Sequence, residues 1–405
     1  MLLISSLLRR IVLRQNNMIQ EGNVRTIPEK PVTDKVSIII PTHNGGRAFQ
    51  RNLKTILQQK HIPDKEIIIV DSSSADGTSE LARKNGCKVF SIRKERFGHG
   101  RTRAHGVSKS GGKHIIMTVQ DAQPAHRYSY AQLINFAVEN DLVAASGNQI
   151  PFKNADSYAM WQHTRHTSLM NPHQVSVVYD AAQMSGDYFW NLDFLQKRKF
   201  SCIDDVYAYY SRDLFEMCTF SDIDFAEDVD MAVKILLLHK KIGITNQSSV
   251  YHSHLSTLHE IFHRAYQDAI SLNTIFRTKP DREATETTLQ SSMYTIFLIL
   301  DVIAAHPRIS SHRSLVQQCL SVVNKKKTIT PFYQSSVSLL LTESHFDYRY
   351  LHHLSTNEVV VDYQQYCSTR SIPFNYAKII SSVLGYQLGV LLFHFGDQGY
   401  LDIIK

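Results

Sequence analysis

Residues 36–46 read VSIIIPTHNGG, a run of β-branched residues that Pro41 and a glycine-containing turn bring to an end. Similar apolar runs return at residues 66–71 (EIIIVD), 88–92 (KVFSI) and 114–119 (HIIMTV), with helix-like stretches between them. Runs without polar alternation are typical of strands that are buried on both faces of a parallel sheet. Short buried strands that alternate with helices therefore predict an α/β fold with helices covering both faces of the sheet.

The residues at the ends of these strands are the first candidates for a site, because parallel α/β sheets bind ligands at the carboxyl ends of their strands. They are His43, Asp71 and Asp121. Asp71 could accept hydrogen bonds from a ribose or a base, or it could be a turn or helix-capping aspartate. Asp121 could bind Mg²⁺ or Mn²⁺, which often keep waters and substrate phosphates as their other ligands, or it could be a turn residue.

Residues 97–106 (FGHGRTRAHG) carry two arginines, two histidines and three glycines. Glycines allow close approach of the backbone to a phosphate, and arginines can bind a diphosphate through paired hydrogen bonds. The glycine spacing fits neither a P-loop nor the GxGxxG dinucleotide motif. The segment is therefore either a diphosphate-binding loop of another kind or a solvated basic turn.

Three further segments carry acid–base or metal-binding side chains. Residues 225–230 (FAEDVD) open a predicted helix, so their carboxylates could favour the helix N-terminus or supply a general base. His252 and His254 follow the predicted strand 242–250 at alternating positions, which lets either imidazole complete a metal site. Residues 259–263 (HEIFH) match the HExxH zinc-peptidase signature, but no third-histidine motif follows, and we interpret the match as a coincidence.

The composition limits the class of protein. The chain has 405 residues, of which 43% are apolar and 20% charged, and these values exclude disordered and low-complexity classes. A net charge of +7 suggests an anionic partner, but no basic stripe interleaved with aromatic residues indicates nucleic acid. Five cysteines without a CxxC pair argue against a disulfide framework or a cysteine zinc site, and favour a reducing cytoplasm.

Three regions are expected along the chain: an N-terminal extension over residues 1–35, an α/β domain over 36–257 and a mainly helical C-terminal region over 258–405. The helical expectation rests on the patterns of residues 258–277, 290–305 and 376–395. Since no segment reaches the roughly 20 apolar residues of a transmembrane helix, no membrane span is predicted. The basic N-terminus and residues 379–395 leave peripheral membrane contact open.

Taken in order, seven motifs resemble family 2 glycosyltransferases of the GT-A fold, and more narrowly the rhamnosyltransferase-like enzymes that build bacterial surface polysaccharides. The motifs are IIIPTHNGG (38–46), IIIVDSSSADGT (67–78), FGHGRTRAHG (97–106), TVQDAQP (118–124), YYSRDLF (209–215), FAEDVDMAVKILLLHKK (225–241) and VYHSH (250–254). An ordered series is more specific than any single motif. The resemblance implies a GT-A, Rossmann-like, mixed and mostly parallel sheet with flanking helices, followed by the helical C-terminal region.

The resemblance also implies a role for each candidate residue. The donor nucleotide would be bound by Pro41, Thr42, His43, Asp71, Arg103 and Asp121. A Mg²⁺ or Mn²⁺ ion would be held by Asp121 with His252 or His254. Asp228 of the Glu227–Asp228 pair would be the catalytic base. The chain departs from the family pattern FNHGGTRN at Gly98, Arg101 and Ala104, so the resemblance leaves the donor sugar open.

The implied activity is inverting transfer of a sugar, with L-rhamnose as the candidate, from a nucleotide-diphosphate donor to a hydroxyl of a saccharide acceptor. The acceptor would be lipid-linked or a polysaccharide, as in O-antigen or capsule synthesis, with the enzyme in the cytoplasm at the inner face of the membrane. Two alternatives are a zinc metallopeptidase using His259, Glu260 and His263, and a non-catalytic subunit that binds a sugar nucleotide or a polysaccharide.

Overall fold

The computed structural model describes residues 20–22, 30–171, 175–278, 358–372 and 375–395. The chain divides into two compact units, one formed by residues 1–154 and 163–253 and the other by residues 155–162 and 254–405. The domain limits expected from the sequence stay a prediction. The expected helical segment 290–305 lies outside the described residues.

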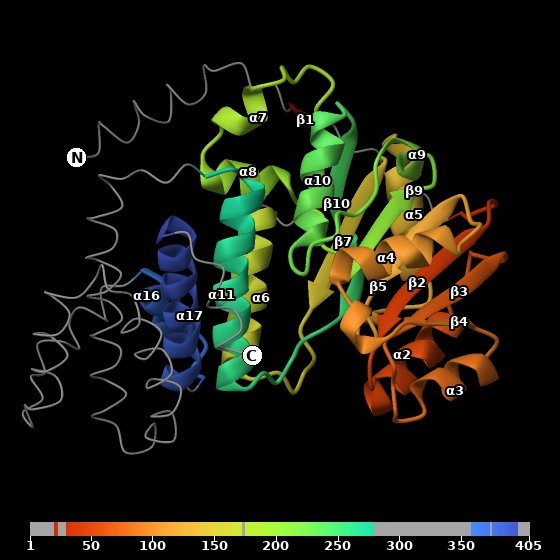
Figure 1. Ribbon diagram of the computed structural model, residues 1–405, viewed down its shortest axis with the longest axis horizontal. Coiled ribbons are helices and arrows are strands. Elements are labelled where there is room, and N and C mark those ends of the chain that lie inside the picture. The colour runs from red at the N-terminus through yellow and green to blue at the C-terminus, as the bar shows by residue number, and fades with distance from the viewer. Residues whose placement is uncertain (1–19, 23–29, 172–174, 279–357, 373–374, 396–405) are drawn as a thin grey trace, which may run out of the picture. The chain divides into compact units, whose positions relative to one another are not determined.

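One mixed sheet forms the centre of the first unit (Figure 1). Its strand order is β1-β8-β10-β7-β9-β5-β2-β3-β4, and β6 pairs with β10. The strands are β1 (Gln20–Gly22), β2 (Val36–Thr42), β3 (Lys65–Asp71), β4 (Lys88–Ser91), β5 (His114–Thr118), β6 (Gln123–Pro124), β7 (Ala144–Ile150), β8 (Val177–Asp180), β9 (Tyr207–Ser211) and β10 (Lys241–Tyr251). Strand β1 lies in the predicted extension, where the sequence shows no strand pattern, and pairs with β8.

Strand directions decide which residues meet at the carboxyl edge of the sheet. Strands β4, β3, β2 and β5 are parallel neighbours, and β7 and β10 are a second parallel pair. Strand β9 lies between β5 and β7 and is antiparallel to both, so β5 and β7 themselves point the same way. The predicted mixed, mostly parallel sheet is confirmed. Because β9 is reversed, the residues that precede it lie at the edge where the parallel strands end.

Helices flank the sheet and follow its strands in the order that the apolar rhythm predicts (Figure 1). The first unit contains α2 (Gly46–Leu57), α3 (Thr78–Lys84), the 3₁₀ turn η1 (Lys94–Arg96), α4 (His99–Ser108), α5 (Ser129–Glu139), α7 (Tyr188–Asn191), α8 (Phe194–Phe200), α9 (Leu214–Met217) and α10 (Glu227–Leu237). Helix α6 (Ser157–Met170) begins in the second unit, which also contains α11 (Leu258–Ile275), α16 (Glu358–Thr369) and α17 (Tyr376–Phe395).

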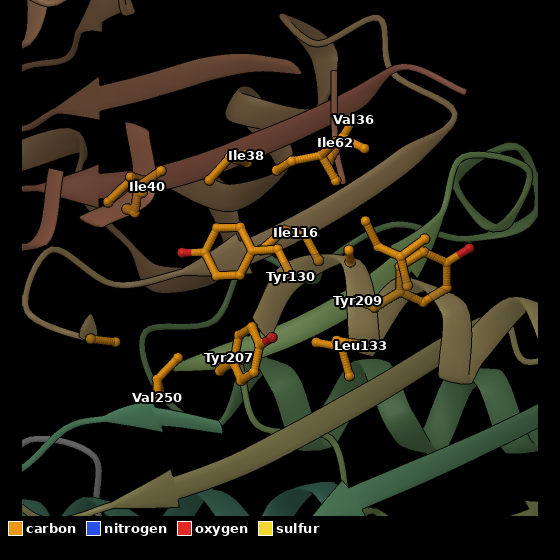
Figure 2. Packing of buried hydrophobic residues seen from close by; sticks show 14 of the residues in the cluster. Val36, Ile38, Ile40, Ile62, Ile116, Tyr130, Leu133, Tyr207, Tyr209 and Val250 are labelled. Carbon is orange, nitrogen blue, oxygen red and sulfur yellow. The ribbon is translucent and has the colours of Figure 1, made fainter. Parts of the chain in front are cut away.

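The packing of β2 shows why its residues are apolar without alternation. Ile38 and Ile40 belong to the core cluster that is shared with residues of α2 and α5 (Figure 2). Ile39 points to the other face, where a Cβ atom at Gly106 of α4 would lie 2.4 Å from its Cγ2 atom. All three isoleucines are fully buried, and burial of each contributes about 1.5–3 kcal/mol. Helices therefore cover both faces of the strand, as the sequence predicts.

Two tyrosines join the reversed strand to its neighbours. The rings of Tyr130 on α5 and Tyr207 on β9 lie 5.6 Å apart between centroids (Figure 2). The Tyr207 hydroxyl donates to the Ser129 carbonyl oxygen at 2.7 Å and lies 2.6 Å from the Ser248 hydroxyl of β10. These contacts hold the amino end of β9 against α5 and β10 and so set the position of the residues just before it.

The described part of the second unit is helical, and α11 and α17 pack closely. A Cβ atom at Gly385 would lie 2.1 Å from the Phe262 carbonyl oxygen, and one at Gly389 would lie 2.5 Å from that of Tyr266. The four-residue spacing of the two glycines therefore lets one face of α17 approach the backbone of α11. Of the helices in the described residues, α17 included, none combines the length and the apolar character needed to cross a bilayer.

Candidate active site

The side chain of Gln120 ties together the loops that follow β2 and β5. Its Oε1 atom accepts a hydrogen bond from the His43 backbone N–H (2.9 Å), and its Nε2 atom donates to the His43 carbonyl oxygen (3.2 Å). Pro41, Thr42 and His43 thus lie on a strand end and loop that are fixed to the residue preceding Asp121. Gln120 has no predicted role, since a side chain that forms hydrogen bonds with a distant backbone leaves no signature in sequence spacing.

Asp71 ends β3 and is only 2% exposed. Its carboxylate accepts hydrogen bonds from the Thr42 hydroxyl (2.8 Å), the Ser74 hydroxyl (2.6 Å) and the Ser74 backbone N–H (3.0 Å). Burial opposes ionisation, but these hydrogen bonds outweigh it and lower the pKa of Asp71 below its ordinary value. Asp71 therefore organises the loops after β2 and β3, and its contact with a nucleoside stays a prediction.

Asp121, His252 and His254 come together at the carboxyl edge. One carboxylate oxygen of Asp121 and one ring nitrogen of each histidine lie within 4.8 Å of one another. The backbone N–H of His252 donates to the Ile150 carbonyl oxygen (2.9 Å), which holds the end of β10 beside β7. His254 follows two residues later on the same chain segment. The structure thus brings together all three predicted metal ligands.

This donor set fits a divalent cation. A carboxylate supplies charge and a hard oxygen, whereas imidazole nitrogens are preferred by transition metals over Mg²⁺. The Nε2 atom of His252 lies 3.8 Å from Oδ1 of Asp121, and His252 is 6% exposed. In the described residues, no other group of three or more histidine, cysteine and acidic side chains has its possible ligand atoms this close together.

The predicted catalytic pair opens helix α10. Ala226 precedes the helix with φ 60°, a left-handed conformation that L-residues adopt at a cost, and it aims the first turn of the helix. Oδ2 of Asp228 accepts a hydrogen bond from the Asp205 backbone N–H (3.3 Å). Burial, together with the negative charges of Glu227, Asp204 and Asp205, raises the pKa of Asp228 well above its ordinary value. A raised pKa is what a carboxylate general base needs near neutral pH.

Arg103 lies beneath this pair rather than in solvent. It is 4% exposed, its Nε atom lies 3.0 Å from Oδ2 of Asp205, and its Nη1 atom lies 2.5 Å from Oε1 of Glu227. The Tyr210 hydroxyl donates to Oδ1 of Asp205 (2.8 Å). Burial raises the pKa of Asp205 to about 7, although Arg103 acts in the opposite direction. The guanidinium thus joins α4, α10 and the segment before β9, and its contact with a diphosphate stays a prediction.

Asp204 and Asp205, which the sequence analysis did not single out, connect the two halves of the site. The Gln149 amide lies between His252 (2.9 Å) and Asp204 (2.6 Å), and Asp205 bonds to Asp228. A continuous line of contacts therefore runs from the metal cluster to the candidate base. The signal that could have revealed both aspartates is their place directly before the strand 207–211, which requires knowing that this strand is reversed.

A cavity of about 190 Å³ opens beside this line of contacts. Its lining includes the polar side chains of Asn148, Gln149, His166, Asn171 and Asp204, together with apolar surface. Amides, a carboxylate and an imidazole can all form hydrogen bonds with hydroxyl groups.

The HEIFH segment has a structural explanation. Glu260 forms a capping box with Thr257 at the start of α11: its Oε2 atom accepts from the Thr257 backbone N–H (2.7 Å), and its own N–H donates to the Thr257 hydroxyl (3.3 Å). The Thr257 hydroxyl also donates to Oε2 (2.9 Å), and the two hydrogen bonds that the carboxylate accepts lower the pKa of Glu260. The glutamate that a zinc peptidase would use as its base thus serves the helix N-terminus.

Comparisons with known proteins give the family of the chain. Residues 37–218 match the family model of Glycosyl transferase family 2. The chain is similar to the O-antigen chain rhamnosyltransferase RfbN of Salmonella typhimurium, with 30% identity over 240 residues that cover 58% of this chain and 72% of RfbN. It is also similar to the O-antigen chain rhamnosyltransferase WbaN of Salmonella anatum, with 24% identity over 237 residues that cover 58% of this chain and 71% of WbaN.

Among solved structures, the mannosyltransferase PcManGT from Pyrobaculum calidifontis, in complex with GDP-Man and Mn²⁺, matches with a TM-score of 0.51 and 16% identity. The match covers 95% of this chain and 94% of that one, and it supports the fold. The predicted GT-A fold is therefore confirmed. The chain belongs to glycosyltransferase family 2, and within that family it is similar to O-antigen rhamnosyltransferases.

Proposed function

We propose that the protein transfers a sugar from a nucleotide-diphosphate donor to a saccharide hydroxyl with inversion at the anomeric carbon, in the synthesis of a bacterial surface polysaccharide such as O-antigen. The observation that carries the proposal is the line of contacts from Asp121 and His252, through Gln149 and Asp204, to the paired Asp205 and Asp228. It joins a cation-binding cluster to a carboxylate of raised pKa at one edge of the sheet.

Asp228 acts as the base in this proposal. Its carboxylate takes the proton from the acceptor hydroxyl while the hydroxyl oxygen forms a bond to the anomeric carbon. The bond from that carbon to the diphosphate oxygen breaks on the opposite face, and the diphosphate leaves with the electron pair. One displacement with one base inverts the configuration. Glu227 and Asp205, held by Arg103, fix the position of Asp228 and keep its pKa high.

Asp121, His252 and His254 would hold the divalent cation. When bound, such a cation supplies Lewis-acid stabilisation of the negative charge on the leaving diphosphate. The two imidazoles favour Mn²⁺ over Mg²⁺ in this set. Pro41, Thr42 and His43 line the same edge, and the loop that Asp71 organises would receive the nucleoside.

The donor and acceptor follow from similarity. RfbN and WbaN are O-antigen chain rhamnosyltransferases, so we propose dTDP-L-rhamnose as the donor. The acceptor would be a lipid-linked or polysaccharide hydroxyl, presented at the cytoplasmic face of the membrane, where the protein would make peripheral contact. The polar cavity beside Asp204 would bind part of the acceptor saccharide.

A donor panel tests the proposal. The full chain is incubated with an acceptor saccharide and with dTDP-L-rhamnose, UDP-sugars or GDP-sugars, in Mn²⁺, in Mg²⁺ or in chelator. We expect transfer from dTDP-L-rhamnose that requires the cation, and a product whose anomeric configuration, read by NMR, is opposite to that of the donor. Retention of configuration would refute the single displacement, and transfer from another donor alone would refute the assignment of rhamnose.

A further inference from the structure

The Nδ1 side of the His252 ring contacts a series of hydrogen-bonded polar side chains. Nδ1 of His252 lies 2.9 Å from Oε1 of Gln149, and Nε2 of Gln149 donates to Oδ2 of Asp204 at 2.6 Å. Nε2 of His166 lies 3.5 Å from the same Asp204 oxygen. His252 is buried, and these polar contacts act together with the edge-on ring of His163, at 6.3 Å between centroids, on the orientation of its ring.

The protonation state of Asp204 decides which atoms of Gln149 and His252 donate and which accept hydrogen bonds. Burial alone would raise the pKa of Asp204, but attraction to His166 and a hydrogen bond from the Val206 backbone lower it, so its carboxylate is ionised and only accepts. Gln149 must therefore turn its NH₂ group to Asp204 and its carbonyl oxygen to His252. That oxygen also only accepts, so the proton of the neutral imidazole must lie on Nδ1.

The opposite nitrogen of the ring then carries a lone pair. It faces Oδ1 of Asp121 at 3.8 Å, so two electron-rich atoms point at each other. A cation between the two atoms would stabilise this arrangement. The other tautomer would instead set the Nδ1 lone pair against Oε1 of Gln149 at 2.9 Å. The geometry thus selects Nε2 as the nitrogen that meets a cation.

We propose that Gln149, oriented by Asp204, is a positioning residue that fixes the tautomer of His252 and presents Nε2 to the metal ion. The inference rests on the metal site of the proposed function. Neither residue touches the ion, and both act through His252. Outer partners of this kind typically change metal affinity by about 10- to 100-fold when they are replaced.

Paired substitutions test the proposal by Mn²⁺ affinity, measured by titration calorimetry or by the electron paramagnetic resonance of unbound Mn²⁺. Gln149→Met keeps the length of the side chain and removes its amide, and we expect Mn²⁺ binding to weaken by about 10- to 100-fold. Gln149→Glu alone sets two carboxylates against each other and should also weaken binding. The double variant Gln149→Glu/Asp204→Asn reverses the donor and acceptor of that contact, keeps an oxygen toward His252 and should restore affinity.

Asn148→Ala is the matched control, because Asn148 lies on the same strand and lines the same cavity. Its affinity should stay within about twofold of the unaltered protein. Ring ¹⁵N shifts of His252 in the metal-free protein report the tautomer directly, and we expect a protonated Nδ1 that is lost in Gln149→Met.

Unchanged affinity in Gln149→Met, or a protonated Nε2 in the unaltered protein, would overturn the inference. Absence of Mn²⁺ binding by the unaltered protein would instead refute the metal site of the proposed function, and with it the role of Nε2 toward a metal. The ring shifts would then still decide whether Gln149 sets the tautomer.

Discussion

At the scale of single residues, the site depends on carboxylates placed against one another. Asp205, Glu227 and Asp228 gather around one buried cation, Arg103, and Asp204 adds a further negative charge near Asp205 and Asp228. The excess of negative charge favours retention of a proton. A base embedded in such a group binds a proton more strongly than an exposed aspartate does. The same group would be costly if its members were not hydrogen-bonded, and Tyr210 and the backbone of residues 205 and 206 supply those bonds.

Replacing Asp228 distinguishes a role in proton removal from a role in donor binding. Asp228→Asn keeps the shape and removes the basic oxygen, so kcat should fall by about 10²- to 10⁴-fold while donor affinity changes little. Asp230→Asn is the matched control, since Asp230 lies in the same helical turn but pairs with Lys234 at 2.9 Å. Steady-state kinetics and donor titration measure both effects. Wild-type turnover in Asp228→Asn would remove this residue from the mechanism.

Ala226 carries strain next to the base. Its φ of 60° is costly for an L-residue and free of that cost for glycine, so Ala226→Gly should leave stability unchanged or raise it by up to about 1 kcal/mol. Ala226→Val should lower stability by more than about 1 kcal/mol, because a β-branched residue tolerates this conformation least. Denaturant unfolding measures both. An equal loss of stability in the two variants would mean that side-chain packing, and not φ, determines which residue is favoured at position 226.

At the scale of elements, α4 packs beside the start of α10 at a position that only glycine fits. A Cβ atom at Gly100 would lie 2.0 Å from the Ser221 carbonyl oxygen and 3.3 Å from Cβ of Glu227. The Ser221 backbone cannot move aside as a flexible side chain does, so any larger residue at position 100 would force α4 to shift. This contact explains a glycine inside a helix, where its intrinsic preference is poor.

Gly100→Ala should therefore lower stability by about 1–3 kcal/mol, despite the better helix propensity of alanine, and should lower turnover through displacement of Glu227. Gly186→Ala is the control, because a Cβ atom there has no neighbour within 4 Å among the described residues and should change little. Thermal unfolding and transfer rates measure the two outcomes. An unchanged Gly100→Ala variant would show that α4 and the segment around Ser221 adapt freely.

At the scale of the whole molecule, the buried carboxyl group of Asp205 makes the stability of the fold depend on pH. The pKa of Asp205 is about 7 in the folded protein and 3.8 ordinarily, so the folded state holds a proton across that window and the unfolded state does not. Proton binding at Asp205 therefore stabilises the folded state by at most about 4 kcal/mol. This stabilisation is fully present below about pH 4 and is lost as the pH rises through about 7.

The comparison of unaltered protein with Asp205→Asn tests this contribution, because groups remote from Asp205, such as His114, are common to both. Asp228 loses the negative charge of Asp205 in the variant, which lowers the pKa of Asp228 and flattens the slope further. Between pH 5 and 8 the free energy of unfolding should fall more steeply with pH in the unaltered protein than in the variant. Urea unfolding at several pH values measures the slopes. Parallel slopes would show that Asp205 does not hold the proton.

Much of the fold is readable from local patterns. The unalternating runs of β2, β3 and β5 report strands with both faces covered, because each side chain of the strand then needs an apolar neighbour. The rule that ligands bind after such strands leads directly to His43 and Asp121. It misses Asp204 and Asp205, which precede β9, because a single strand's own sequence does not report whether its neighbours run parallel or antiparallel to it.

The sequence by itself determined the α/β class, the family resemblance and the identity of the residues at the edge, because periodicity and ordered motifs are local properties of the chain. Only the tertiary structure decided that Arg103 is buried against Asp205 and Glu227, that Asp71 bonds to Thr42, and that Gln149 contacts His252. Ion pairs and hydrogen bonds between residues dozens to more than a hundred positions apart depend on strand order and direction. These long-range contacts set the charge, the tautomer and the orientation on which the chemistry depends.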